Sequence, residues 1–76
     1  MRMSVNKEDP GYENLDYSAA VYLDGVLQRM VETADEESGY VCRYATDPTG
    51  VLIVEGDALV TEEVFGEVRI VLGGVE

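Results

Sequence analysis

The sequence predicts a mainly β fold: a small antiparallel meander or barrel of about five short strands with a flexible N-terminal arm. Apolar runs rich in Val, Ile and Tyr alternate along the chain with short turn sequences, and such runs suit half-buried pleated strands. Two of the runs, 40–45 and 67–72, also alternate residue by residue between two faces. The 76 residues are enough for one small domain.

Residues 1–16 are expected to form the arm, and residues 17–76 the single small domain. The first segment holds turn-forming and charged residues without periodicity, including Asn6, Asp9, Pro10 and Gly11. Simple disorder is the ordinary expectation for such a terminus. An ordered arm laid across a partner is the functional alternative.

Turn chemistry divides the domain into the apolar runs 19–23, 26–33, 40–45, 51–55 and 67–72. Asp24-Gly25 predicts a two-residue hairpin, because both central positions of that turn need a positive φ. Asp47-Pro48-Thr49-Gly50 fits a type I turn, with proline presetting φ at its second position. Gly56-Asp57 marks a further turn. Residues 58–65 fit either a short helix opened by Asp57 or an edge strand ending at Gly66.

An α+β fold is the alternative, with one helix near 17–35 packed on a three-stranded antiparallel sheet. On a helical wheel the apolar residues of this stretch form one continuous side, and Asp16 and Gly39 suit its two ends. Against the helix, Tyr17 and Val21 would face solvent, and Gly25 would cost about 1 kcal/mol in its interior.

The net charge of −11 comes from 16 acidic against 5 basic residues. A direct grip on nucleic acid or on an anionic membrane needs a basic face, so both are excluded as expected partners. The acidity fits an ordinary solvated surface, an imitation of nucleic acid, or a halophilic proteome. Acidic surfaces also steer a protein toward basic partners.

The N-terminal sequence has no apolar signal-peptide core, and no run approaches the roughly 18 apolar residues of a membrane span. We therefore expect a protein that stays in the cytoplasm of a host cell or is carried in a virion. Cys42 is the single cysteine, which excludes an internal disulfide. Its place between Tyr40 and Tyr44 in a predicted strand favours a small buried side chain over a reactive thiol.

The spacing of these turns resembles that of small acidic proteins encoded by bacteriophages and prophages, often within virion structural gene clusters. The similarity covers residues 19–72 and is carried by Tyr22-Leu23-Asp24-Gly25-Val26, Gly39-Tyr40-Val41, Gly56-Asp57 and Gly66-Glu67-Val68. The resemblance implies a β-hairpin, rather than a helix, in the first half of the domain. It also implies a virion role without catalytic residues.

No catalytic, cofactor-binding or metal site can be assembled from the sequence. Histidine is absent, which removes Ser-His-Asp and Cys-His arrangements. Adjacent acids such as Glu62-Glu63 are ordinary in solvated turns, and the 35–39 stretch lacks the spacing of a calcium loop. Arg29, Arg43 and Arg69 occupy three predicted strands, where cross-strand pairing with acids is the ordinary expectation and an anion-binding face the alternative.

Two functions follow. The first is a non-enzymatic phage-type accessory or virion structural protein that acts through protein–protein contacts, with itself or with a virion component. The second is an acidic inhibitor that imitates nucleic acid and binds a basic nucleic-acid-binding protein; Glu32 and Asp35 would contribute to it. The candidate contact residues are aromatic or acidic: Tyr12, Tyr17, Glu36, Glu37, Glu62 and Glu63. Tyrosine is favoured at interface cores.

Overall fold

The computed structural model describes residues 1–74, and in it the chain is mainly β with antiparallel pairing throughout. The elements, in chain order, are β1 (Arg2–Ser4), η1 (Pro10–Asn14), β2 (Ala20–Leu23), β3 (Val26–Gln28), β4 (Val31–Asp35), β5 (Tyr40–Tyr44), β6 (Val54–Glu55), β7 (Ala58–Leu59), β8 (Thr61–Phe65), β9 (Val68–Val71) and η2 (Leu72–Gly74). The mainly β prediction is confirmed, with about nine short strands rather than about five. Residues 17–35 form a hairpin and a further strand, so the helical alternative is wrong.

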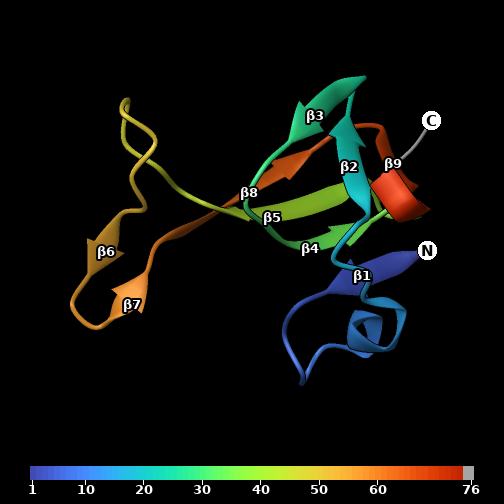
Figure 1. Cartoon of the computed structure of the whole chain (residues 1–76), viewed down its shortest axis with the longest axis horizontal. Coiled ribbons are helices and arrows are strands. Elements are labelled where there is room, and N and C mark those ends of the chain that lie inside the picture. The colour runs from blue at the N-terminus through green and yellow to red at the C-terminus, as the bar shows by residue number, and fades with distance from the viewer. Residues whose placement is uncertain (75–76) are drawn as a thin grey trace.

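Two sheets enclose the core, with strand orders β1-β4-β5-β8 and β3-β2-β9 (Figure 1). Both sheets contribute to its buried apolar side chains, which are Met3, Val21, Ala34, Val41, Val68 and Ile70. Val41 in the centre of β5 is fully buried. Ser4 and Thr33 are buried on neighbouring strands, and their hydroxyl oxygens lie 2.8 Å apart in a hydrogen bond. This bond satisfies both polar groups inside the core.

The predicted Asp24-Gly25 hairpin is present and joins β2 to β3. Leu23 pairs with Val26, and φ is 51° at Asp24 and 82° at Gly25, as a type I′ turn requires. The turn is also fixed from a distance, because the Glu67 amide donates to the Asp24 carboxylate at 2.8 Å. A Cβ at Gly66 would lie 2.7 Å from that carboxylate, so a larger residue there would have to displace the Asp24 side chain.

The predicted strand over 26–33 is divided in the structure, and its two parts belong to different sheets. β3 ends at Gln28 and β4 begins at Val31. Between them Met30 has a φ of 57°, and the register against β5 shifts between Val31 and Thr33. Such a bend lets one chain segment pass around a corner from one sheet to the other.

The N-terminal segment is placed differently from the predicted flexible arm. β1 pairs with β4, with Met3 opposite Ala34, and Met3 belongs to the core. Arg2 holds η1 against this strand through two hydrogen bonds to Asp9, at 2.8 and 2.7 Å, and one to Asp35 at 3.2 Å. Part of residues 1–16 is therefore an edge of the first sheet.

Cys42 is 6% exposed in the middle of β5, opposite Thr33 on β4 and Glu63 on β8. The prediction that it is a buried side chain is confirmed.

Candidate partner-binding surface

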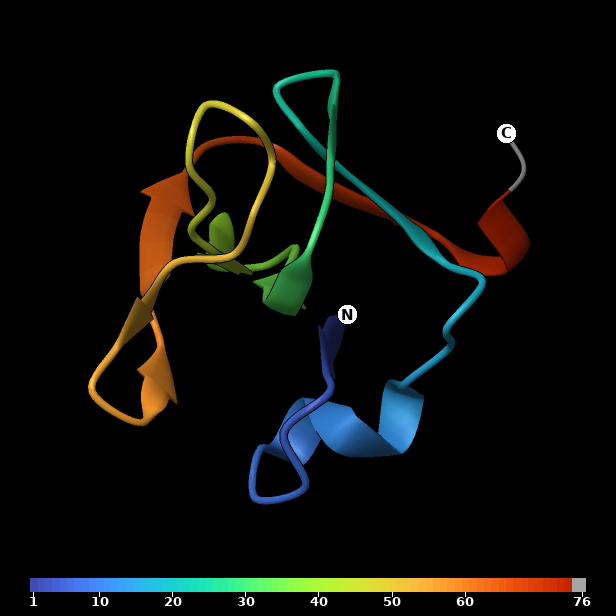
Figure 2. The same cartoon turned by 60° about the vertical axis from the view of Figure 1, so that its left-hand side comes forward.

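A hairpin formed by residues 51–60, which we call the projecting hairpin, stands away from the two sheets in both views (Figures 1 and 2). β6 and β7 pair within it, with Val54 opposite Leu59, and the two-residue turn Gly56-Asp57 forms its tip. Sequence reasoning placed a turn at Gly56-Asp57, and the structure confirms it. Residues 58–65, which fitted two structures, contain β7 and the edge strand β8.

Backbone hydrogen bonds clamp the root of the projecting hairpin to the end of β5. The Ala45 amide donates to the Val60 carbonyl at 2.8 Å, and the Ile53 amide donates to the Ala45 carbonyl at 3.1 Å. Next to this junction, the predicted turn at 47–50 closes with the Gly50 amide donating to the Asp47 carbonyl at 2.9 Å. The hairpin therefore leaves the domain from a fixed base.

The projecting hairpin is apolar and lacks a covering surface within residues 1–74. All residues from Ile53 to Leu59 are exposed. Val54 is 59% and Leu59 44% exposed, and Val51 at its base is 61% exposed. Contiguous exposed apolar side chains of this kind mark interaction sites.

An open groove of about 460 Å³ lies at the base of this hairpin, and we call it the root groove. Its apolar wall comes from β3 and the bend that follows, with Val26, Leu27 and Met30 all exposed. The remaining lining residues are polar, aromatic or glycine: Gln28, Arg29, Arg43, Tyr44, Thr46, Gly50 and Glu62.

Two of the chain's five basic residues line the root groove. The Arg43 side chain donates to Glu62 at 2.8 Å and to the side-chain oxygen of Gln28. Arg43 and Glu62 are direct partners across β5 and β8, so cross-strand pairing holds for this arginine. Arg29 is exposed, and its side chain forms no hydrogen bond or ion pair within the described part of the chain.

Met30, on the wall of the root groove, combines exposure with an uncommon backbone conformation. Its φ is 57°, and its side chain is 56% exposed. A left-handed conformation at a residue other than glycine costs about 1–2 kcal/mol. Such strain is concentrated at functional sites, and methionine adapts well to irregular binding surfaces.

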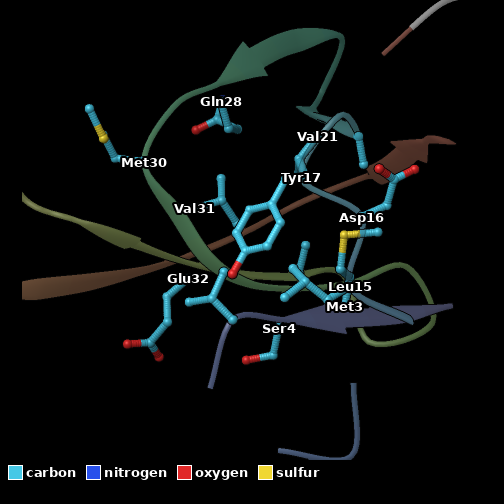
Figure 3. A pocket seen from close by; sticks show the side chains of 13 residues that line it. Met3, Ser4, Leu15, Asp16, Tyr17, Val21, Gln28, Met30, Val31 and Glu32 are labelled. Atoms are coloured by element: carbon cyan, nitrogen blue, oxygen red, sulfur yellow. The ribbon is translucent and has the colours of Figure 1, made fainter. Parts of the chain in front are cut away.

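A second, smaller cavity of about 180 Å³ opens between β1, β2, β4 and the segment that follows η1 (Figure 3). Met3, Leu15 and Val31 are among its apolar lining residues, and Asp16 and Glu32 lie on opposite sides of it in this view. The cavity is mainly a gap in the packing of the two sheets, because residues of the core line it.

The six candidate contact residues do not gather at one place. Two of them line the cavities: Tyr17, which is 86% exposed, the smaller one, and Glu62 the root groove. Tyr12 lies in η1, Glu37 in the turn after β4, and Glu63 next to Glu62 on β8.

The sixth candidate, Glu36, is occupied within the fold. Its carboxylate accepts hydrogen bonds from the Ile70 amide at 2.9 Å and from the N-terminal ammonium of Met1 at 3.1 Å. These bonds hold the pKa of Glu36 below its usual value, against the opposing effect of partial burial. Its role is therefore to connect β9 to the start of the chain.

Several other carboxylates stabilise separate turns. Hydrogen bonds from the Arg2 side chain and the Gly11 amide lower the pKa of Asp9 to about 2. Hydrogen bonds from the Ser18 hydroxyl and amide lower the pKa of Asp16. Hydrogen bonds from the Thr49 hydroxyl and the Val51 amide lower the pKa of Asp47. Much of the acidity thus serves local structure at points spread along the chain.

Residues 1–74 contain no cluster of three or more metal-ligating side chains. Neither helix in that range is long and apolar enough to cross a membrane.

Sequence reasoning did not identify the projecting hairpin as a contact surface. The signal available was the run Val51-Leu52-Ile53-Val54 next to the acidic turn residues Glu55 and Asp57. An unbroken apolar run is typical of a buried strand, so the sequence gives no sign that these side chains are exposed.

Comparison of the chain with family models, with curated proteins and with solved structures found no match.

Proposed function

We propose that this protein is a non-enzymatic protein–protein contact module that uses its projecting hairpin to join a larger assembly. A bacteriophage accessory or virion structural protein is the setting that we favour, because the turn pattern of residues 19–72 resembles such proteins. The observation that carries the proposal is the apolar hairpin, exposed along its whole length from Ile53 to Leu59.

The size of the molecular surface supports this proposal. The chain exposes 5071 Å², whereas a folded monomer of 8.3 kDa is expected to expose about 4,600 Å². The Cα radius of gyration is 12.2 Å, against about 11.4 Å expected for 76 residues. The excess of both quantities is in keeping with an element that lacks its packing partner.

Stability arguments point the same way. A two-stranded hairpin without a sheet or helix against it is marginally stable in water. The projecting hairpin is held at its root but has no apolar surface to pack on within residues 1–74. A partner that covers Val54 and Leu59 would supply that surface and order the tip.

The acidic side chains do not favour the second function, imitation of nucleic acid. A mimic must present free carboxylates at phosphate-like spacing on one side. Three of the acids predicted for that role are occupied within the fold: Asp35 accepts from Arg2, Glu36 from the Ile70 amide, and Glu62 from Arg43. We therefore propose no inhibitor function.

Site-specific photo-crosslinking in the cells that produce the protein tests the proposal. A photoreactive phenylalanine analogue at Leu59 should give discrete crosslinked proteins. The same analogue at Glu13, which is exposed in η1, is the matched control and should give none. Identification of the captured chain by mass spectrometry, with a phage head or tail protein among the products, would support the virion setting.

Equal crosslinking at both positions, or none at Leu59, would contradict a contact function for the hairpin. Captured proteins that are all cellular and unrelated to a particle would contradict the virion setting alone.

A further inference from the structure

The projecting hairpin and the root groove carry charges of opposite sign that lack partners. Asp57 lies in the tip and Glu55 next to it, and neither forms a side-chain hydrogen bond or ion pair within residues 1–74. Arg29, on the wall of the groove, is also without a partner in that range.

The projecting hairpin and the root groove also both expose aliphatic side chains. Val54 and Leu59 form a cross-strand pair next to the tip, and both are exposed. Val26, Leu27 and Met30 offer an exposed apolar wall beside Arg29. A hairpin end that presents two aliphatic side chains and two carboxylates therefore matches a groove with an aliphatic wall and an arginine.

The root groove lies beside the base of the projecting hairpin, so two copies can each insert a hairpin into the other's groove. Thr46 and Gly50 belong to the segment that leads into the projecting hairpin, and both line the root groove. At about 3.3 Å per residue, the strand from Ile53 to the turn reaches about 10 Å beyond the root. Two copies that use the same surface both to insert a hairpin and to bind one can form a closed dimer with two-fold symmetry.

We propose that the occupant of the root groove is the projecting hairpin of a second copy of this chain, in a reciprocal exchange that forms a dimer. Arg29 of each copy pairs with Glu55 and Asp57 of the other, while Val54 and Leu59 cover the wall at Val26, Leu27 and Met30. β3 is an edge strand of its sheet within residues 1–74, so backbone pairing with an incoming strand is also open to it. This inference rests on the proposed contact function and names its partner.

The first measurement is the molar mass of the purified full chain by sedimentation equilibrium in about 0.15 M salt, where the Debye length is about 8 Å. We expect a monomer–dimer equilibrium that reaches twice the chain mass of 8.3 kDa. A monomer at every concentration up to about 1 mM, the range of the weakest specific complexes, would overturn the proposal.

Charge reversal then tests the pairing. Arg29→Glu should weaken the dimer at least tenfold, and so should the double variant Glu55→Arg/Asp57→Arg. Combining all three substitutions should restore association to within about threefold of the original chain, because the charges are exchanged but still complementary. Dimers that survive each reversal unchanged, or a combined variant that remains monomeric, would overturn the assignment of Arg29.

Matched controls carry the same charge changes near η1, away from the root groove. Lys7, Glu8 and Glu13 are exposed there, so Lys7→Glu matches the charge change of Arg29→Glu, and Glu8→Arg/Glu13→Arg matches that of the double variant. Both controls should leave the dimer constant unchanged. Circular dichroism of every variant verifies that it folds.

The crosslinking test above separates this inference from the proposed function. Capture of a different protein at Leu59, with the purified chain monomeric, would overturn the dimer and leave the contact function standing. An absence of capture at Leu59 would overturn both.

Discussion

At the scale of single residues, Arg2 connects three elements of the fold. Its guanidinium group joins β1 to η1 through Asp9 and to the end of β4 through Asp35. The two bonds to Asp9 form the bidentate geometry that makes arginine–carboxylate pairs strong. Asp9 is mostly buried, with a side-chain exposure of 14%, so solvent screens this pair less than an exposed one.

Replacing Arg2 by methionine should lower the free energy of unfolding by about 1–2 kcal/mol, because two partly buried carboxylates lose their partner. Lys7→Met is the matched control: Lys7 is exposed and makes no ion pair in the described chain, and its loss should change stability by less than about 0.5 kcal/mol. Urea unfolding monitored by circular dichroism measures both. Equal effects of the two substitutions would refute the role given to Arg2.

The lowered carboxylate pKa values predict how stability depends on pH. The pKa of Asp9 is about 2 in the folded chain against an ordinary 3.8, and those of Asp16, Asp35, Glu36 and Asp47 are lowered as well. A depressed pKa stabilises the fold above the ordinary value, and this contribution is lost as the pH falls toward the folded value.

Stability should therefore fall steeply between about pH 4 and pH 2, as measured by the urea midpoint at pH 7, 4 and 2.5. In the Arg2→Met variant the loss over this window should be smaller, since Asp9 then titrates closer to its ordinary pKa. Parallel pH profiles for the two proteins would contradict this account.

At the scale of elements, the Asp24-Gly25 hairpin was predictable and the N-terminal strand was not. Positive φ at two successive positions is a local requirement, and few residues besides Asn, Asp and Gly meet it. β1, in contrast, has only three residues, and its partner β4 lies about thirty residues further along the chain. No periodicity can appear in so short a strand, so its pairing depends on tertiary contacts that local rules do not contain.

The difference between local turn chemistry and tertiary contacts also explains why the exposure of the projecting hairpin could not be predicted. The pattern around 51–60 gave the turn at Gly56-Asp57 correctly, because turn chemistry is local, but it left residues 58–65 open between a short helix and an edge strand. Whether Val54 and Leu59 are covered depends on how far the hairpin stands from the two sheets. The division of 26–33 at Met30 was also hidden, because methionine has no preference for a positive φ.

The contact between the Asp24 carboxylate and the Glu67 amide links two elements that are far apart in sequence. Asp24→Ala removes this hydrogen bond and places alanine at a φ of 51°, so we expect a loss of about 1–2 kcal/mol. Asp24→Asn is the matched control, because asparagine tolerates a positive φ and its side-chain oxygen can still accept from the Glu67 amide, and a loss below about 0.5 kcal/mol is expected. Thermal unfolding measures both variants. Equal losses would contradict the role given to this hydrogen bond.

At the scale of the whole molecule, the net charge of −11 opposes any contact between two copies. Two such molecules repel over distances comparable to the Debye length, which is about 30 Å at 0.01 M salt and about 10 Å at 0.1 M. The attraction between Arg29 and the hairpin tip acts over contact distances only. Apolar burial of Val54 and Leu59 depends little on salt at these concentrations.

Association should therefore strengthen as salt is raised from about 10 mM to about 0.15 M, because screening removes the long-range repulsion first. Sedimentation equilibrium across this range, with the Lys7→Glu variant alongside, measures the change. Weaker association at the higher salt would mean that charge pairing, rather than apolar burial, dominates the interface.

The position of Cys42 gives the native chain an internal kinetic probe. Its thiol lies in the middle of β5, with strands on both sides, and is 6% exposed. A thiol reagent can reach it only when the fold opens locally around β5. The rate of modification then reports how often this part of the fold opens, without any substitution or label. Dimerisation through the projecting hairpin, which is clamped to the end of β5, should slow that rate, so thiol protection would follow assembly at concentrations too low for mass measurements.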